Sequence, residues 1–331
     1  MQVLRPELIL AVAAAGLSWS LIGLYTLAMR ASRRLEAPNP RSMHEVAIPV
    51  GAGLAMVGTI LLLWPWWGGA ASGASLVLLG GVALLGMLSW MDDLTGLPPV
   101  VRLIAQALAV ALCLVWLPPE ARVLPIVPTP AERLLLGIAW LWFVNLFNFM
   151  DGIDGLAGSE ALAVAVGYLI VSAWAGLDGE LCRLAIVLAA VAMAYLLWNW
   201  HPSSVLMGDA GSIPLGFLLG WLMLDLAFRG CWAAAVILPL YFVADATFTL
   251  AARALRGEKL SQPHREHFYQ RAVLAGVAPP GVVLRVGAVN AVLVLLALVS
   301  LAHPVWALAA ALIVVAGLLV HLDRLACRRA P

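Results

Sequence analysis

Aspartates border long apolar segments at three places along the chain. They lie in short stretches that contain glycine, at Asp92, Asp93, Asp151, Asp154 and Asp209. Adjacent carboxylates repel one another, so a pair held together indicates a bound cation or a raised pKa on one member. Carboxylate oxygens are also the ligands that hard cations such as Mg²⁺ prefer. These residue types favour a site that binds a hard cation or performs acid–base chemistry.

Polar residues recur every third position in the stretch NLFNFMDGIDGLAGS, as Asn145, Asn148, Asp151 and Asp154. If a helix persists through this stretch, they share one of its faces. Polar groups at a membrane boundary are costly unless they meet a ligand, a metal or other polar groups. The interleaved glycines allow the backbone to approach a bound group closely. The alternative is a capped helix end followed by a turn, with Asp154 near the next helix N-terminus.

The remaining aspartates also have structural interpretations. Helix ends often carry aspartate, and Asp209 precedes an apolar segment, as an N-cap residue does. Backbone N–H groups at such a terminus favour an anion, so Asp209 can hold a cation between the helix and that anion. We therefore predict Asp209 as a metal ligand and keep the N-cap as the alternative.

The stretch SQPHREHFYQR adds basic residues, namely His264, Arg265, His267 and Arg271. A histidine pair at this spacing can bind a transition metal, but an aspartate-rich, thiolate-free site prefers a hard ion. Arginine binds phosphate through paired hydrogen bonds. A basic loop that contacts anionic lipid is the alternative. Carboxylates, glycines and this basic loop together indicate phosphoryl transfer, which depends mainly on positioning and charge neutralisation.

The elements that position these residues are membrane helices. Apolar residues make up 63% and charged residues 11% of the 331 positions, which excludes an ordinary water-soluble domain. Since about 20 apolar residues cross the bilayer, we predict an all-α polytopic bundle of about eleven spans in a single domain over residues 1–331. The spans are expected near residues 7–29, 47–67, 74–91, 100–117, 131–149, 160–177, 183–200, 212–228, 232–252, 280–301 and 304–322.

The distribution of Lys and Arg predicts the orientation of the bundle. These residues collect on the cytoplasmic side of membrane proteins, and most of them fall there if the N-terminus is periplasmic. The aspartate loops and the His/Arg loop then share the cytoplasmic face. Only Ala302, His303 and Pro304 separate the last two spans, so one kinked helix and ten spans are the alternative. The isolated cysteines indicate neither a zinc site nor disulfides, and the net charge gives no sign of nucleic-acid binding.

Five stretches follow one another in the order RSMHEVAIPVGAG, DDLTGLPP, NFMDGIDGLAGS, GDAGS and PHREHFYQR. They resemble the motifs of the polyprenyl-phosphate N-acetylhexosamine-1-phosphate transferase family, which is glycosyltransferase family 4. The resemblance covers residues 41–271, about two thirds of the chain. It implies an enzyme of the bacterial inner membrane that transfers a sugar-1-phosphate from a UDP-N-acetylhexosamine to undecaprenyl phosphate and releases UMP. Its partners would be these substrates and the bilayer, with a homodimer left open.

The resemblance also implies residue roles. Asp209 resembles the Mg²⁺ ligand, with Mn²⁺ as an alternative ion, and Asp92 and Asp93 resemble an acidic pair shared between metal binding and the lipid phosphate. Which of the pair has which role is left open. Catalytic residues by this resemblance are Asp92, Asp93, Asp151, Asp154, His264 and His267. Substrate-binding residues are His44, Asn145, Asn148, Arg265 and Arg271.

The chain departs from the family pattern in two places. Val50 stands where the family often has arginine, so one phosphate contact is absent or supplied elsewhere. The loop from His264 to His267 differs from the triple-histidine loop of the peptidoglycan enzyme, which favours members of the O-antigen type that use UDP-GlcNAc, UDP-QuiNAc or UDP-FucNAc. Asp245 and Arg253 are given a supporting role.

Other classes of membrane protein remain as alternatives. A phospho-MurNAc-pentapeptide translocase would share most of these motifs. A transporter or flippase would carry acidic residues near the membrane midplane and in repeated halves, but only Asp225 and Asp245 fall well inside the predicted spans and no repeat is visible. A non-catalytic relative is the last alternative, and Val50 is the feature that favours it.

Overall fold

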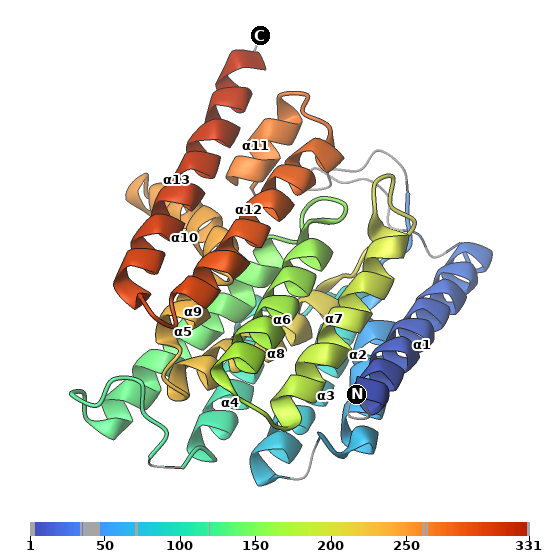
Figure 1. The fold of residues 1–331 in the computed structure, drawn as a ribbon. Helices are drawn as coiled ribbons and strands as arrows, with labels where there is room; N and C mark the ends of the chain where they lie inside the picture. The colour runs from blue at the N-terminus through green and yellow to red at the C-terminus, as the bar shows by residue number, and fades with distance from the viewer. Residues whose placement is uncertain are drawn as a thin grey trace.

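The structure is a computed structural model that describes residues 4–33, 35, 47–69, 72–118, 120–259, 262 and 264–329. Within these ranges every named element is a helix, and the long helices lie side by side in one bundle (Figure 1). The elements are α1 Leu4–Ala31, α2 Gly53–Trp64, a short π-helical turn η1 Pro65–Gly69, α3 Gly73–Thr95, α4 Pro99–Val115, α5 Thr129–Phe149, α6 Leu156–Ala175, α7 Glu180–Asn199, α8 Asp209–Phe228, α9 Trp232–Ile237, α10 Leu240–Leu255, α11 Phe268–Leu274, α12 Pro279–Val299 and α13 Pro304–Arg329.

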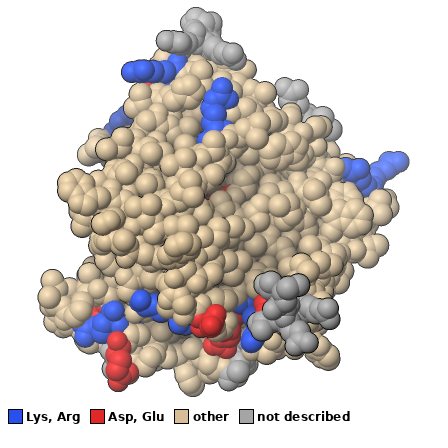
Figure 2. Space-filling view, in the orientation of Figure 1, with Lys and Arg blue, Asp and Glu red and all other residues tan. Residues whose placement is uncertain are grey.

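Eight helices of the described chain are long and apolar enough to cross a membrane, namely α1, α3, α5, α6, α7, α8, α12 and α13. The shorter apolar helices Gly53–Gly68 and Pro99–Val115 accompany them. Figure 2 shows a broad face that is mostly free of charged side chains, with Lys, Arg, Asp and Glu gathered toward its upper and lower ends. The prediction of an all-α, multi-pass membrane protein is confirmed, while its orientation stays a prediction.

The structure resolves three of the predicted spans, those at residues 232–252, 280–301 and 304–322, into four helices. The span expected at residues 232–252 is broken into α9 and α10, because Pro239 lacks the N–H group that would continue the first helix. The last pair of spans consists of two separate helices, α12 and α13, which pack against each other. The alternative of one kinked helix at Pro304 is therefore wrong.

Helix α8 lies in the interior of the bundle. Every residue from Ala210 to Leu224 is buried, and the helix packs against α2, α3, α5, α6 and α9. Small residues permit this close packing, since a side chain at Gly220 would overlap the ring of Trp140. Because Asp209 is the first residue of α8, it is held at the centre of one end of the bundle.

The start of α2 is tied to the start of α8 by backbone hydrogen bonds. The N–H groups of Gly51 and Gly53 donate to the carbonyls of Leu206 and Met207 at 3.1 Å and 3.0 Å. A Cβ atom added at Gly53 would lie 2.1 Å from the backbone nitrogen of Gly211. Only glycine therefore allows the two helices to cross at this distance, next to Asp209.

We predict that Gly53→Ala destabilises the protein, because the added methyl group overlaps backbone atoms that cannot move without separating α2 from α8. The expected loss is about 1–3 kcal/mol, measured as a lower unfolding temperature in detergent. Gly58→Ala is the matched control, since Gly58 lies in the same helix and a Cβ atom there meets nothing within 4 Å. Equal unfolding temperatures for the two variants would contradict the prediction.

Candidate active site

An arginine connects two of the predicted aspartates. The Nη1 atom of Arg102 lies 2.6 Å from Oδ2 of Asp92 and 2.8 Å from Oδ2 of Asp209. Asp92 also accepts a hydrogen bond from the backbone N–H of Leu97 at 2.6 Å, just beyond the end of α3. Helices α3, α4 and α8 thus meet in one charged cluster. Arg102 is a site residue that the sequence analysis did not identify.

The two adjacent aspartates of α3 have different surroundings. Asp92 is ion-paired and its side chain is 9% exposed. Asp93 is more exposed and faces the N-terminus of α8, where its Oδ2 accepts from the N–H of Ala210 at 3.3 Å. A Cβ atom at Gly208 would come within 3.0 Å of the same carboxylate oxygen. The absence of a side chain at Gly208 therefore leaves space for the Asp93 carboxylate next to Asp209.

Helix α5 brings an amide and a further carboxylate to this cluster. The side chain of Asn148 accepts from the hydroxyl of Ser212 at 2.7 Å and bonds with Asp209. Asp151 follows in the turn after α5, partly buried. Burial, and then the charges of Asp209 and Asp154, raise the pKa of Asp151 to about 7. Asp151 therefore exchanges its proton near neutral pH.

Asp154 turns toward a different segment. Its Oδ2 lies 2.8 Å from Nδ1 of His201 and accepts from the backbone N–H of Ser203 at 3.1 Å. The four polar residues from Asn145 to Asp154 do not share a helix face, because α5 ends at Phe149. The structure has the alternative arrangement, a helix end followed by a turn with Asp154 just before the start of α6. His201 was missed by the sequence analysis, and only its place shortly before the GDAGS stretch could have drawn attention to it.

The His/Arg loop carries less free positive charge than its sequence indicates. His267 is 2% exposed and lies against Asp245, with 3.2 Å between Nδ1 and Oδ1. Burial, His267 and Arg253 lower the pKa of His264 to about 4, so His264 is neutral at neutral pH. Arg271 pairs with Asp323 of α13 at 2.7 Å. The role of Arg271 in phosphate binding stays a prediction, now opposed by this ion pair.

The other predicted substrate contacts have the following positions. Asn145 donates to Oε1 of Gln106 at 2.8 Å, which links α5 to α4 inside the bundle. Arg265 lies partly buried on the loop between the two histidines. His44 lies outside the described residues, so its role stays a prediction.

The donor atoms of the cluster suit a hard divalent cation, since Asp93, Asp151, Asp209 and Asn148 offer only oxygen ligands at this end of α8. Within the described ranges, no three His, Cys, Asp or Glu side chains converge closely enough to enclose a metal ion. Arg102 instead bridges Asp92 and Asp209. A metal held by Asp209 would have to share that carboxylate with Arg102 or replace it.

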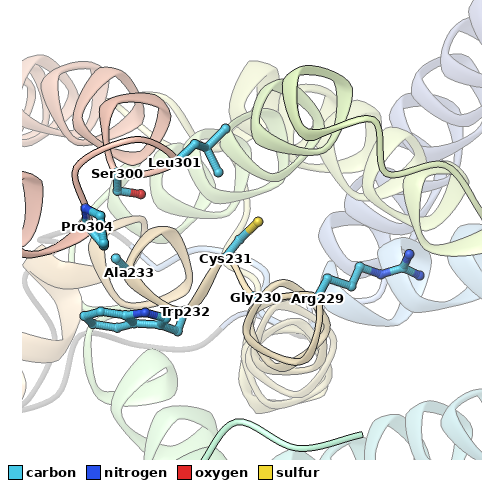
Figure 3. A pocket seen from close by; sticks show the side chains of 8 residues that line it. All are labelled: Arg229, Gly230, Cys231, Trp232, Ala233, Ser300, Leu301 and Pro304. Atoms are coloured by element: carbon cyan, nitrogen blue, oxygen red, sulfur yellow. The ribbon is translucent and has the colours of Figure 1, made fainter.

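A separate pocket of about 190 Å³ lies at the other end of α8, far along the helix from Asp209 (Figure 3). It is formed where the turn after α8 faces the turn between α12 and α13. The lining residues are Arg229, Gly230, Cys231, Trp232, Ala233, Ser300, Leu301 and Pro304. None of the aspartates of the cluster lines it, so it is no part of the candidate active site.

Comparisons with known proteins agree with this geometry. The model of glycosyl transferase family 4 matches residues 75–227, a range that contains every aspartate of the cluster. A Bacillus subtilis protein named as a probable undecaprenyl-phosphate N-acetylglucosaminyl 1-phosphate transferase is 26% identical over 82% of this chain and 78% of its own length.

Two phospho-N-acetylmuramoyl-pentapeptide-transferases are also similar. The protein of Thermosynechococcus vestitus is 29% identical over 65% of this chain and 61% of its own length. This chain therefore spans less than two thirds of that relative. The protein of Mycolicibacterium paratuberculosis is 28% identical over 74% of this chain and 79% of its own length. The family model, these relatives and the assembly of the aspartates at one end of α8 agree, and the chain belongs to glycosyl transferase family 4, the polyprenyl-phosphate hexosamine-1-phosphate transferases.

Proposed function

We propose that the protein transfers a sugar-1-phosphate from a UDP-sugar to undecaprenyl phosphate. An oxygen of the lipid phosphate attacks the sugar-linked phosphorus of the donor, the diphosphate P–O bond breaks, and UMP leaves. The product is undecaprenyl diphosphate sugar. The observation that carries this proposal is the cluster of Asp92, Asp93, Asp151 and Asp209 with Arg102, located where a membrane-buried helix begins. The names of the relatives support the same reaction.

The residues of the cluster have different proposed roles, which follow from their surroundings. Asp209 and Asp93 are the proposed ligands of Mg²⁺, or of Mn²⁺ in its place, and the ion would supply positive charge to the phosphates. Asp92 holds Arg102, whose guanidinium is suited to a phosphate oxygen. Asp151 can take up a proton near neutral pH, because burial and neighbouring carboxylates raise its pKa to about 7.

We propose an N-acetylhexosamine donor and a place at the start of a cell-envelope polysaccharide, in the bacterial inner membrane. The Bacillus subtilis relative, whose name specifies N-acetylglucosamine, supports this donor class. The two relatives named as pentapeptide transferases support the muramoyl donor as the second candidate. A homodimer remains a proposal that a measurement of mass in solution tests directly.

The first prediction concerns activity. Purified protein with undecaprenyl phosphate, Mg²⁺ and a panel of UDP-N-acetyl sugars, including UDP-MurNAc-pentapeptide, should release UMP with at least one donor. Omission of the lipid phosphate should abolish this release, because the lipid is the nucleophile. The absence of UMP with every donor, in an assay in which a known relative is active, would remove the proposed function.

The second prediction concerns the central carboxylate. Asp209→Asn should lower turnover by at least about 100-fold, since an amide binds a divalent cation more weakly and the charge beside Arg102 is lost. Asp178→Asn is the control, because Asp178 is an exposed aspartate before α7, at the opposite end from the cluster. Expression and insertion should be unchanged in both variants. Normal turnover in Asp209→Asn would remove Asp209 from the metal role.

The third prediction follows from Asp151. Its pKa is about 7 in the folded chain and about 3.9 in an unfolded one, so the folded state holds a proton that the unfolded state releases over this window. Without divalent metal, the stability of the protein should therefore fall as the pH rises from about 4 to about 7. Asp151→Asn should weaken this dependence, measured as unfolding temperature against pH. An unchanged dependence in the variant would refute the assignment.

A further inference from the structure

A carboxylate inside the bundle holds the start of α11. Asp245, in α10, is fully buried and accepts hydrogen bonds from its own helix and from the His/Arg loop. Within α10 the donors are the hydroxyls of Tyr241 at 3.1 Å and Thr249 at 3.4 Å. From the loop they are His267 Nδ1 at 3.2 Å and the backbone N–H groups of Phe268 at 3.1 Å and Tyr269 at 3.4 Å.

This arrangement satisfies groups that would otherwise be costly to bury. The first N–H groups of a helix have no acceptor within the helix, and those of Phe268 and Tyr269 find one in Asp245. A buried carboxylate in turn needs donors on both oxygens. The start of α11 is also closed on itself, since the backbone N–H of His267 donates to the side chain of Gln270 at 3.3 Å. The loop is therefore anchored at one point of α10.

The anchored end of the loop also lies directly on the segment that carries Asp151. The ring of Tyr269 stacks on that of His267 and its hydroxyl donates to the carbonyl of Phe149 at 3.3 Å. A Cβ atom at Gly152 would come within 2.1 Å of the same hydroxyl. The absence of a side chain at Gly152 is thus what allows α11 to rest beside Asp151.

We propose that Asp245 is a positioning residue of the active site, which holds the start of α11, and with it the adjoining His264 and Arg265, in place relative to the turn that carries Asp151. The functional part of this inference rests on the proposed transfer reaction, whereas the anchoring of the loop does not. His267 is then not a substrate contact: its buried ring lies 4.9 Å from the ring of His264 and connects that residue to Asp245.

The rest of the loop has its own attachments, so removal of the Asp245 charge should act locally. Arg253 pairs with Glu258 at 2.8 Å and Glu266 at 3.5 Å, and Arg256 pairs with both glutamates. These ion pairs attach Glu258 and Glu266 to the end of α10 without using Asp245. The variant Asp245→Asn should therefore release the start of α11 and displace the adjoining His264 and Arg265 without detaching the whole loop.

Hydrogen exchange measured by mass spectrometry on the full-length protein in detergent tests the anchoring. An asparagine at position 245 accepts at one atom only and turns an NH₂ group toward the donors. In Asp245→Asn, amide exchange in the peptides that contain residues 264–274 should rise by about tenfold or more. Tyr241→Phe is the matched control, because it removes a donor to the same carboxylate from α10 and leaves every loop donor in place. Its exchange should match that of the wild type.

Activity provides the second readout. Asp245→Asn should lower kcat/KM for UMP release by about tenfold or more, and addition of Arg265→Ala should cause little further loss beyond the larger of the two single effects. Independent, additive losses would mean that Asp245 does not act through the loop. Unchanged exchange in folded Asp245→Asn would overturn the anchoring itself. If the wild type releases no UMP while exchange still rises, the proposed function fails and the anchoring stands.

A second variant covers the case in which Asp245→Asn does not fold. Gly152→Ala places a methyl group against the hydroxyl of Tyr269 and leaves Asp245 intact. It should raise exchange in the same peptides, because α11 can no longer rest on the turn with Asp151. Wild-type exchange in folded Gly152→Ala would overturn the proposed contact between the loop and the active-site turn.

Discussion

The burial of α8 along almost its whole length is the constraint on which the active site depends. Helices α2, α3, α5, α6 and α9 surround it, so neither lipid nor water reaches its middle. Its first residue, Asp209, is consequently fixed where the bundle meets water, and its neighbours bring Asp93 and Asn148 to the same place. A site at this boundary is open to a phosphate carried by a lipid and to a water-soluble nucleotide sugar.

Electrostatics then decide what the site can bind. Arg102 compensates Asp92 and Asp209, but no ion pair within the described residues involves Asp93 or Asp151. Carboxylates held this close destabilise one another unless a proton or a further cation is added. The raised pKa of Asp151 favours the added proton, and a divalent ion would be the further cation. The same excess of negative charge would repel phosphates, so the reaction we propose needs that additional cation.

Composition and motif order were sufficient to predict the membrane bundle and the gathering of aspartates. The bundle follows from the apolar runs, and the gathering follows from the order of the spans, which places the aspartate stretches on one side of the bundle. The pairings of Arg102 with Asp209 and of His201 with Asp154 were not predictable, because each joins residues that are distant in the chain. The span predicted at residues 131–149 ends at the same residue as α5, but the position of Asp154 was not predictable, because a spacing of three residues places side chains on one face only while the helix continues.

The motif that joins His264 to His267 shows why residue type alone does not assign a role. The two histidines look equivalent in sequence, yet one is 2% exposed against a buried carboxylate and the other is partly exposed. A side chain that binds the donor sugar must be accessible to it. The buried side chain of His267 is not accessible. Selectivity among donors is therefore expected to depend on the loop residues just before His267, whereas Asp245 and His267 set where that loop lies. Replacement of the exposed residues is then expected to change the donor without moving the carboxylates that we propose for the transfer.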